Sequence, residues 1–134
     1  MRQAYLDAWA VRDEALHRAD PGLLSRRFTD GDPSEVVGNL PAGAASALRL
    51  VSDSVAARVE GGFDVAGGVD HDIQSVEVSD SEASAQVVDR ITDRTYLVRR
   101  ATGVRESSDE ATVATQTWFL VRRDGEWKVI YFAQ

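Results

Sequence analysis

The segment VVDRITDRTY carries two aspartates, Asp89 and Asp93, four residues apart. If the segment forms a strand, both carboxylates lie on one side of it, because side chains alternate between the two faces. A carboxylate that is buried away from water has a raised pKa and can abstract or shuttle a proton. Tyr96 and Trp118 are candidate neighbours for such a group. The spacing therefore supports one hypothesis, a catalytic site with Asp89 or Asp93 as general base beside Tyr96 or Trp118.

A structural role for the same segment is also open. Each aspartate is followed by an arginine, and such doubled pairs are typical of charges that neutralise one another. Across a sheet they would pair with Arg122, Arg99 or Glu126 on exposed surface, where each ion pair contributes little. A general base also needs an orienting partner and a dry pocket, and the sequence shows neither. The residues therefore favour a protein that is not an enzyme.

Other catalytic and metal sites find little support. The chain has no cysteine, which excludes thiol chemistry and disulfides, and it has no G-x-S-x-G motif. The two histidines are His17 and His71. His71 stands in the run DHD, which could suggest a metal site. Adjacent residues of a strand point to opposite faces, however, so we expect these residues to form a solvated entry to a strand. His17 lies where it would favour the C-terminal end of a helix dipole. We expect no metal site and no cofactor.

Composition narrows the range of partners. The 134 residues include 15 basic and 22 acidic side chains, for a net charge of −7 at pH 7. An acidic globule repels phosphate backbones, so we expect no nucleic-acid partner. Apolar runs are too short for a bilayer span, so we expect no membrane insertion by this chain. The compartment stays open: cytoplasmic by default, or the soluble domain of an exported or membrane-anchored protein. A single lysine among the basic residues is typical of a GC-rich bacterial genome.

The period of the apolar residues divides the chain into a helical and an extended part. Between about residues 2 and 60 the period is near 3.6, which predicts helices over 4–20, 21–28 and 42–60. From about 63 to 133 the period is 2, which predicts antiparallel strands. Helices followed by strands predict a single α+β domain, in which three N-terminal helices pack on a curved antiparallel sheet of four or more strands.

Within the extended part, turn residues predict the connections. The sequence SDSE and the pair Asp124–Gly125 are expected to form hairpin turns. We interpret residues 82–99 as one long strand with a bulge at Val87–Val88, where two apolar neighbours cannot share a face. The chain ends on the apolar run EWKVIYFAQ. We therefore expect the last strand to lie inside the sheet as part of the core.

Two pieces of this pattern resemble a known superfamily. The run IQSVEVSDSEASAQVVDR and the terminal LVRRDGEWKV are similar to the nuclear-transport-factor-2-like (cystatin-like α+β) cone fold. The continuation DRTYLV and the alanine-rich third helix most resemble the non-enzymatic intermembrane-space-type domain of plastid-division proteins and its bacterial relatives, and then SnoaL-like proteins. This fold hosts isomerases, hydrolases, dehydratases, transport factors and assembly modules, so it does not choose a function by itself.

The resemblance implies a concave sheet face that something must cover. We predict a non-catalytic module that binds a protein partner or a small apolar ligand through this face, and that forms a homodimer. The aromatic residues Trp9, Phe63, Tyr96 and Trp118 are the predicted binding residues, because large rings are either core or pocket walls in a small domain. The alternative is a small SnoaL-like or isomerase-type enzyme with an aspartate base in the cone pocket.

Overall fold

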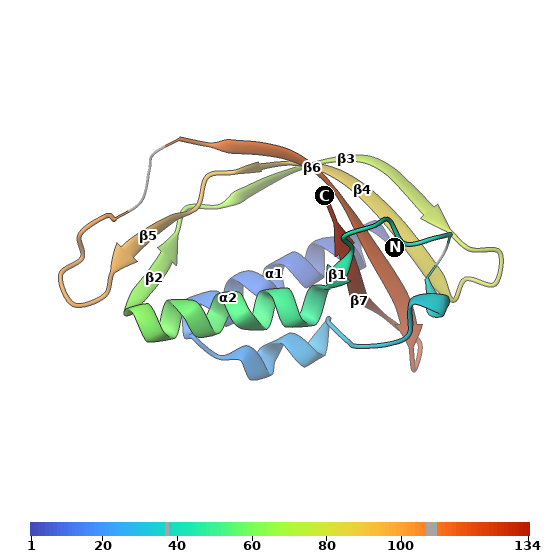
Figure 1. Cartoon of the computed structure of the whole chain (residues 1–134), viewed down its shortest axis with the longest axis horizontal. Coiled ribbons are helices and arrows are strands. Elements are labelled where there is room, and N and C mark those ends of the chain that lie inside the picture. The colour runs from blue at the N-terminus through green and yellow to red at the C-terminus, as the bar shows by residue number, and fades with distance from the viewer. Residues whose placement is uncertain (37, 107–109) are drawn as a thin grey trace.

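A curved antiparallel sheet arches over a layer of helices (Figure 1). The structure is a computed structural model that describes residues 1–36, 38–106 and 110–134. It has the predicted α+β architecture, with the helices in the N-terminal part and an antiparallel sheet of five strands, four of which follow the last helix. The polar run ATGVRESSDE at 101–110 is typical of a hairpin loop, and residues 107–109 of it lie outside the described part.

The N-terminal part forms α1 (Arg2–Arg18), η1 (Pro21–Arg26), η2 (Pro33–Glu35) and α2 (Ala47–Gly61). Of the three predicted helices, the short second one is a 3-10 helix, and the third begins at Ala47 instead of near residue 42. The start of α2 has a local cause, since the Ser46 hydroxyl accepts a hydrogen bond from the backbone N–H of Arg49. The helix ends at Gly62, whose φ of 71° is left-handed and costs glycine little.

The strands are β1 (Ala45–Ser46), β2 (Phe63–Ala66), β3 (Val69–Val78), β4 (Ser84–Asp93), β5 (Tyr96–Arg99), β6 (Thr112–Arg123) and β7 (Glu126–Ala133). Five of them form one sheet in the order β1-β7-β6-β4-β3, and β2 pairs with β5 in a separate ribbon. β7 therefore has a strand on each side, as predicted from its apolar residues. Asp124 and Gly125 both have positive φ, as a two-residue hairpin turn requires.

The segment 82–99 is not the single strand that the sequence predicted. β4 ends at Asp93, whose carboxylate accepts hydrogen bonds from the backbone N–H and the hydroxyl of Thr95. Such a local side-chain bond competes with strand pairing. In the segment that faces this point, Gly67 has a φ of 79°, and a Cβ at Gly67 would collide with the backbone of Arg94. The two paired segments therefore bend together, and the β2–β5 ribbon leaves the main sheet at this corner.

The bulge predicted at Val87–Val88 was placed in the wrong strand. The burial pattern of β4 alternates through this region, with Asp89 among the buried side chains. The register between β3 and β4 instead shifts between Ile73 and Ser75, so Gln74 is the extra residue. The two neighbouring valines need no bulge, because one faces the core and the other faces the outer side of the sheet.

Buried apolar side chains form a cluster on each face of the sheet. The larger cluster lies between the sheet and the helices, and it includes Tyr5, Trp9 and Trp118. The smaller one lies where the segment between η1 and β1 covers β6 and β7. Its buried members are Val36, Phe119, Val121, Ile130 and Ala133. The outer face of the sheet is therefore partly covered by the protein's own chain.

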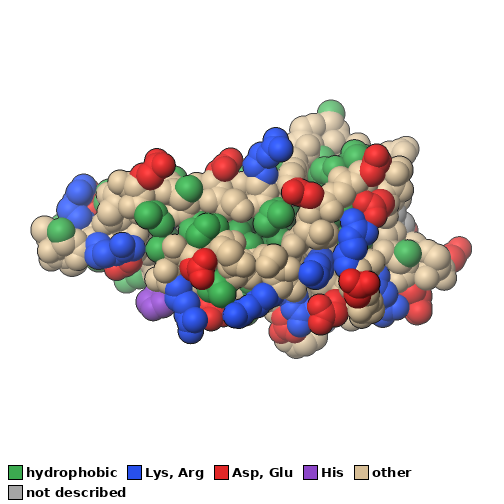
Figure 2. Space-filling model, turned by 90° about the horizontal axis from the view of Figure 1, so that it is seen from below, with side chains coloured by type: hydrophobic (Ala, Val, Ile, Leu, Met, Phe, Trp, Pro, Cys, Tyr) green, Lys and Arg blue, Asp and Glu red, His purple; other side chains and the backbone are tan. Residues whose placement is uncertain are grey.

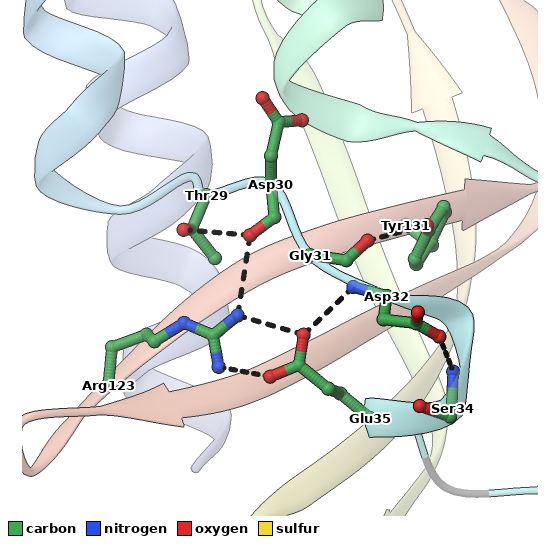
Figure 3. A network of polar contacts seen from close by, with 8 residues as sticks. All are labelled: Thr29, Asp30, Gly31, Asp32, Ser34, Glu35, Arg123 and Tyr131. Atoms are coloured by element: carbon green, nitrogen blue, oxygen red, sulfur yellow. Dashed lines mark hydrogen bonds and ion pairs between the residues drawn. The ribbon is translucent and has the colours of Figure 1, made fainter.

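A polar clip holds this covering segment against the β6–β7 hairpin (Figure 3). Both carboxylate oxygens of Glu35 accept hydrogen bonds from the guanidinium of Arg123. The same carboxylate accepts from the backbone N–H of Asp32, and the Tyr131 hydroxyl donates to the Gly31 carbonyl at 2.8 Å. The hydrogen bond with Arg123 lowers the pKa of Glu35. We call the Glu35–Arg123 pair with its loop the Glu35–Arg123 clip.

Candidate functional site

A cavity of about 190 Å³ lies between the helices α1 and α2 and the inner face of the sheet. Its lining residues come from α1, α2, β4, β6 and β7: Trp9, Arg12, Leu50, Val51, Ser54, Ile91, Asp93, Thr112, Ala114, Gln116, Trp118, Phe132 and Gln134. Ile91 on β4 and Ala114 on β6 are directly paired across the sheet. The cavity is therefore the space that the two helices leave unfilled over the middle of the cone.

Three aromatic rings form a continuous wall of this cavity. The ring of Trp118 lies 4.7 Å from that of Phe132 and 5.2 Å from that of Trp9, measured between centroids. These separations are those of rings in direct contact, which pack edge to face or tilted. Trp9 and Trp118 are only 8% and 4% exposed, so the rest of each ring is held by the core. The wall is therefore rigid and apolar.

The polar side chains of the cavity are held by neighbours. Asp93 accepts both of its hydrogen bonds from Thr95 on Oδ1, at 2.9 Å from the backbone nitrogen and 2.6 Å from the hydroxyl. The Gln116 carbonyl oxygen accepts from the Trp118 indole N–H at 3.1 Å. Arg12 pairs with Asp13 at 3.0 Å and lies over the Trp9 ring. Each group is thus oriented before a ligand arrives.

Asp89 lies beside the cavity, in the core, and does not line it. Its carboxylate is 0% exposed. Oδ2 accepts a hydrogen bond from the Tyr5 hydroxyl at 2.6 Å and lies 2.6 Å from Nδ1 of His71, while Oδ1 accepts from the backbone N–H of Asp72 at 3.0 Å. Which of Oδ2 and Nδ1 carries the proton depends on the tautomer of His71. We call Tyr5, His71 and Asp89 the buried polar cluster.

Burial dominates the electrostatics around this cluster. It raises the pKa of Tyr5 well above its ordinary 10.0, and the hydrogen bond to Asp89 acts in the same direction. Tyr5 is therefore a fixed hydrogen-bond donor. Burial also raises the pKa of Asp13, against the opposing effect of Arg12. Burial thus disfavours the ionised form of both side chains.

Three of the predicted site residues come together at the cavity. Trp9 and Trp118 form part of its wall, and Asp93 lies among its polar residues. Asp89 was paired with Asp93 in the catalytic hypothesis, and it does share the inner face of β4. Its three hydrogen bonds and complete burial separate it from the cavity, however.

The other two predicted binding residues lie on the β2–β5 ribbon. Phe63 has the Arg99 guanidinium over its ring at 4.9 Å, and Tyr96 has that of Arg105 over its ring at 3.7 Å. Neither residue lines the cavity. Both rings were expected to be core or pocket walls. The corner after Asp93 carries the ribbon that holds them away from the cavity.

Two expectations about charged residues were wrong. His71 is not a solvated strand entry: its side chain is 17% exposed and bonded to Asp89. Asp89 makes no exposed cross-strand pair, and Arg99 pairs with Glu106 instead. The reason is the same in both cases. The inner face of β3 and β4 is covered by α1, so polar residues there must find partners inside the core.

Sequence reasoning missed several residues of the cavity and of the cluster. Tyr5 was missed although it lies one helical turn before the predicted Trp9 on α1, a spacing that could have placed both beside the same strand. Arg12 continues that face and lines the cavity. Gln116 carried no signal, because its role depends on the indole N–H two residues further along β6.

Two larger functional features are absent from the described residues. No group of three or more histidine, aspartate or glutamate side chains is placed there to hold a metal ion. None of the described helices combines the length and the apolar character needed to cross a bilayer.

Comparison with known proteins identifies the fold. No family model and no curated protein matches the sequence. Among solved structures, the intermembrane-space region of the chloroplast protein ARC6 superposes with a TM-score of 0.68 at 13% identity, covering 96% of this chain and 88% of that one. A ketosteroid isomerase-like protein from Erwinia carotovora atroseptica gives 0.51 at 20% identity, covering 93% and 88%. An NTF-2-like protein from Shewanella oneidensis gives 0.49 at 13% identity, covering 96% and 93%.

This chain therefore has the α+β cone fold of the first two of these solved structures, the fold that the sequence resemblance predicted. Identities this low show the fold alone. Since the same fold supports many activities, function has to be argued from the cavity and its side chains.

Proposed function

We propose that this protein is a non-catalytic cone-fold domain that binds a small, mainly apolar ligand in the cavity beside Trp9 and Trp118. The observation that carries the proposal is the aromatic wall around a cavity of about 190 Å³. An apolar cavity of roughly 150 Å³ is enough to hold a benzene molecule. The cavity thus has room for one ring with small substituents.

A binding role is favoured over catalysis by the state of the carboxylates. Asp89 is buried and has three hydrogen-bonding neighbours, so no ligand in the cavity can reach it. Among the described residues that line the cavity, Asp93 has the one carboxylate side chain, and none is a histidine. A pair of groups able to give and take a proton on the same ligand is not assembled there.

Filling the cavity tests this proposal. Ala114 lines the cavity floor, whereas Thr115 is exposed on the opposite face of the same strand. Ala114→Leu should weaken the binding of 4-ethyltoluene at least about tenfold, or by 1.4 kcal/mol. The control Thr115→Leu should leave the dissociation constant unchanged. Binding would be followed by calorimetry and by NMR shifts of the indole N–H groups. Equal affinity in both variants, or no binding to the unaltered protein, would refute the proposal.

A second candidate function is supported by Asp93. Its Oδ1 is occupied by Thr95, while Oδ2 accepts no hydrogen bond from the described residues. An oriented carboxylate with a free oxygen at an apolar cavity has the geometry of a general base. Deuterium exchange next to the carbonyl group of 2-cyclohexenone, followed by NMR, tests it. Exchange above the buffer rate that Asp93→Asn abolishes would establish catalysis, and exchange at the buffer rate would eliminate it.

The predicted homodimer stays a prediction, and with it the predicted protein partner. Seen from the helix side, hydrophobic side chains gather along the middle of the molecule with charged groups around them (Figure 2). Leu50 and Val59 of α2 are 40% and 45% exposed. Such uncovered apolar surface is common at contacts between subunits. Sedimentation equilibrium gives the test, since a mass of one chain at all concentrations would contradict the dimer.

A further inference from the structure

The hydrogen-bonding groups of the cavity differ in what they can offer a ligand. Asp93, when ionised, can only accept, and its Oδ2 has no partner among the described residues. Gln116 has the opposite character. Its carbonyl oxygen is used by the Trp118 indole N–H, which fixes the amide and leaves the NH₂ group as the donor. One end of the cavity therefore accepts a hydrogen bond, and the other end donates one.

The sheet register sets the arrangement of these two groups. Asp93 is paired with Thr112, Ile91 with Ala114, and Asp89 with Gln116. Asp93 and Gln116 are thus on adjacent strands and offset by four positions, about 13 Å along the strand direction at the usual rise. The pair Ile91 and Ala114 lies between them and provides an apolar floor. A ring over this floor would have one end toward Asp93 and the other toward Gln116.

The charges of the cavity oppose an ionic ligand. Arg12 supplies a cation whose side chain is only 20% exposed, and Asp93 supplies an anion. A ligand with a net charge would meet an opposite charge at one of these two groups and a like charge at the other, whereas an uncharged ligand avoids the like-charge repulsion. The aromatic rings also pack against one another, at interplanar angles of 69° and 43°, instead of surrounding a central point as in a cage for a quaternary ammonium group.

We propose that the ligand is an uncharged compound of one ring with a hydroxyl group at one end and a hydrogen-bond acceptor, such as a carbonyl, at the opposite end. The hydroxyl donates to Asp93, the acceptor receives from Gln116, and the ring lies between the Trp118 side of the cavity and the floor of Ile91 and Ala114. This rests on the proposed function, since it assumes that the cavity is a ligand site.

Four probes of similar size separate the contributions of the hydroxyl group and of the acceptor group to the affinity. They are 4-hydroxyacetophenone with both groups, 4-ethylphenol with the donor, 4-methylacetophenone with the acceptor, and 4-ethyltoluene with neither. Calorimetry at pH 6 keeps both phenols uncharged. The expected order of affinity places 4-hydroxyacetophenone first, about tenfold or more tighter than 4-ethyltoluene, with the two singly substituted probes between them. Benzoate and tetramethylammonium are included as the anionic and cationic alternatives.

Two near-isosteric variants test which cavity residue binds each end of the ligand. Asp93→Asn keeps an oxygen for Thr95, and it should remove the preference for 4-ethylphenol over 4-ethyltoluene. Gln116→Glu keeps an oxygen for the Trp118 indole, and it should remove the preference for 4-methylacetophenone over 4-ethyltoluene. Circular dichroism checks that each variant is folded. If either variant does not fold, the order of the four probes on the unaltered protein still decides.

The outcomes separate this inference from the proposed function. Equal affinity for all four probes would overturn the inference and leave apolar binding intact. Tightest binding of benzoate or tetramethylammonium would also overturn it, in favour of an ionic ligand. No binding of any probe would overturn both. The inference and the proposed function would both be supported by the expected order of the four probes, if Asp93→Asn loses the preference for the hydroxyl group and Gln116→Glu loses the preference for the acceptor group.

Discussion

Asp89 and Asp93 lie on the same face of the same strand, yet their surroundings differ completely. Asp89 lies inside the core, where it accepts a hydrogen bond from the Tyr5 hydroxyl and contacts the ring of His71. Asp93 stands at the end of β4, where the sheet turns its corner, and has one oxygen without a partner among the described residues. The comparison teaches that the same residue type serves two purposes here. One carboxylate organises the core, and the other is available to a ligand.

The largest expected effect comes from removing the buried carboxylate. Asp89→Ala leaves the Tyr5 hydroxyl, the His71 ring and the Asp72 N–H without their acceptor in the core. Each buried unsatisfied group costs about 1–3 kcal/mol, so the free energy of unfolding should fall by about 3 kcal/mol or more. Urea denaturation measures the loss. Asp93→Asn is the matched control and should cost less than about 1 kcal/mol. Similar losses in the two variants would remove the distinction drawn between these aspartates.

A smaller effect is expected from the tyrosine of the same cluster. Tyr5→Phe removes one hydrogen bond to a charged acceptor, which costs about 1.5–3 kcal/mol. The raised pKa of Tyr5 also predicts a dependence on alkaline pH. The unfolded chain ionises this tyrosine above its ordinary 10.0, whereas the folded protein keeps it neutral. Its contribution is therefore complete below pH 10 and declines as pH rises above it.

The dependence of the unfolding free energy on pH tests whether Tyr5 stays neutral in the folded protein. Stability of the unaltered protein should fall above pH 10, and Tyr5→Phe should lose the part of that fall that comes from Tyr5. If the two proteins show the same alkaline slope, the hydroxyl is not held as a neutral donor in the core.

The smallest effect is expected at the exposed Glu35–Arg123 clip. The pKa of Glu35 is lowered from an ordinary 4.5 by the hydrogen bonds of Arg123. The clip therefore contributes above pH 4.5, and its contribution is lost as pH falls through the lowered pKa. Glu35→Gln should flatten this part of the acid profile, with a stability change far below that of Asp89→Ala. Added salt should weaken the clip in the unaltered protein, because exposed charges are screened. A loss as large as that of Asp89→Ala would show that exposure does not separate the two sites.

Much of the fold could be predicted from local signals. The change of period near residue 62, the caps of the helices and the Asp-Gly turn are all local, and they give the order of the elements. The corner after Asp93 could not be predicted in the same way. It depends on Gly67, which lies between β2 and β3 and becomes a neighbour of Arg94 only after these strands have paired.

The candidate site was predicted only in part, for the same physical reason. The alternation along β4 correctly put Asp89 and Asp93 on one face, but it could not tell which would be buried. That is decided by α1, which places Tyr5 beside Asp89, and by the register of β3, which brings His71 to the same oxygen. Both contacts join segments far apart in the sequence, so no local pattern reports them.

The central claim is that a ligand binds over the paired residues Ile91 and Ala114. Intermolecular nuclear Overhauser effects between bound 4-hydroxyacetophenone and the methyl groups of the protein test it most directly. Cross-peaks from the ring protons to the methyl groups of Ile91 and Ala114 are predicted, with none to the exposed methyl groups of Val113 on the opposite face. Cross-peaks confined to other methyl groups, or their complete absence at saturating probe, would contradict the account.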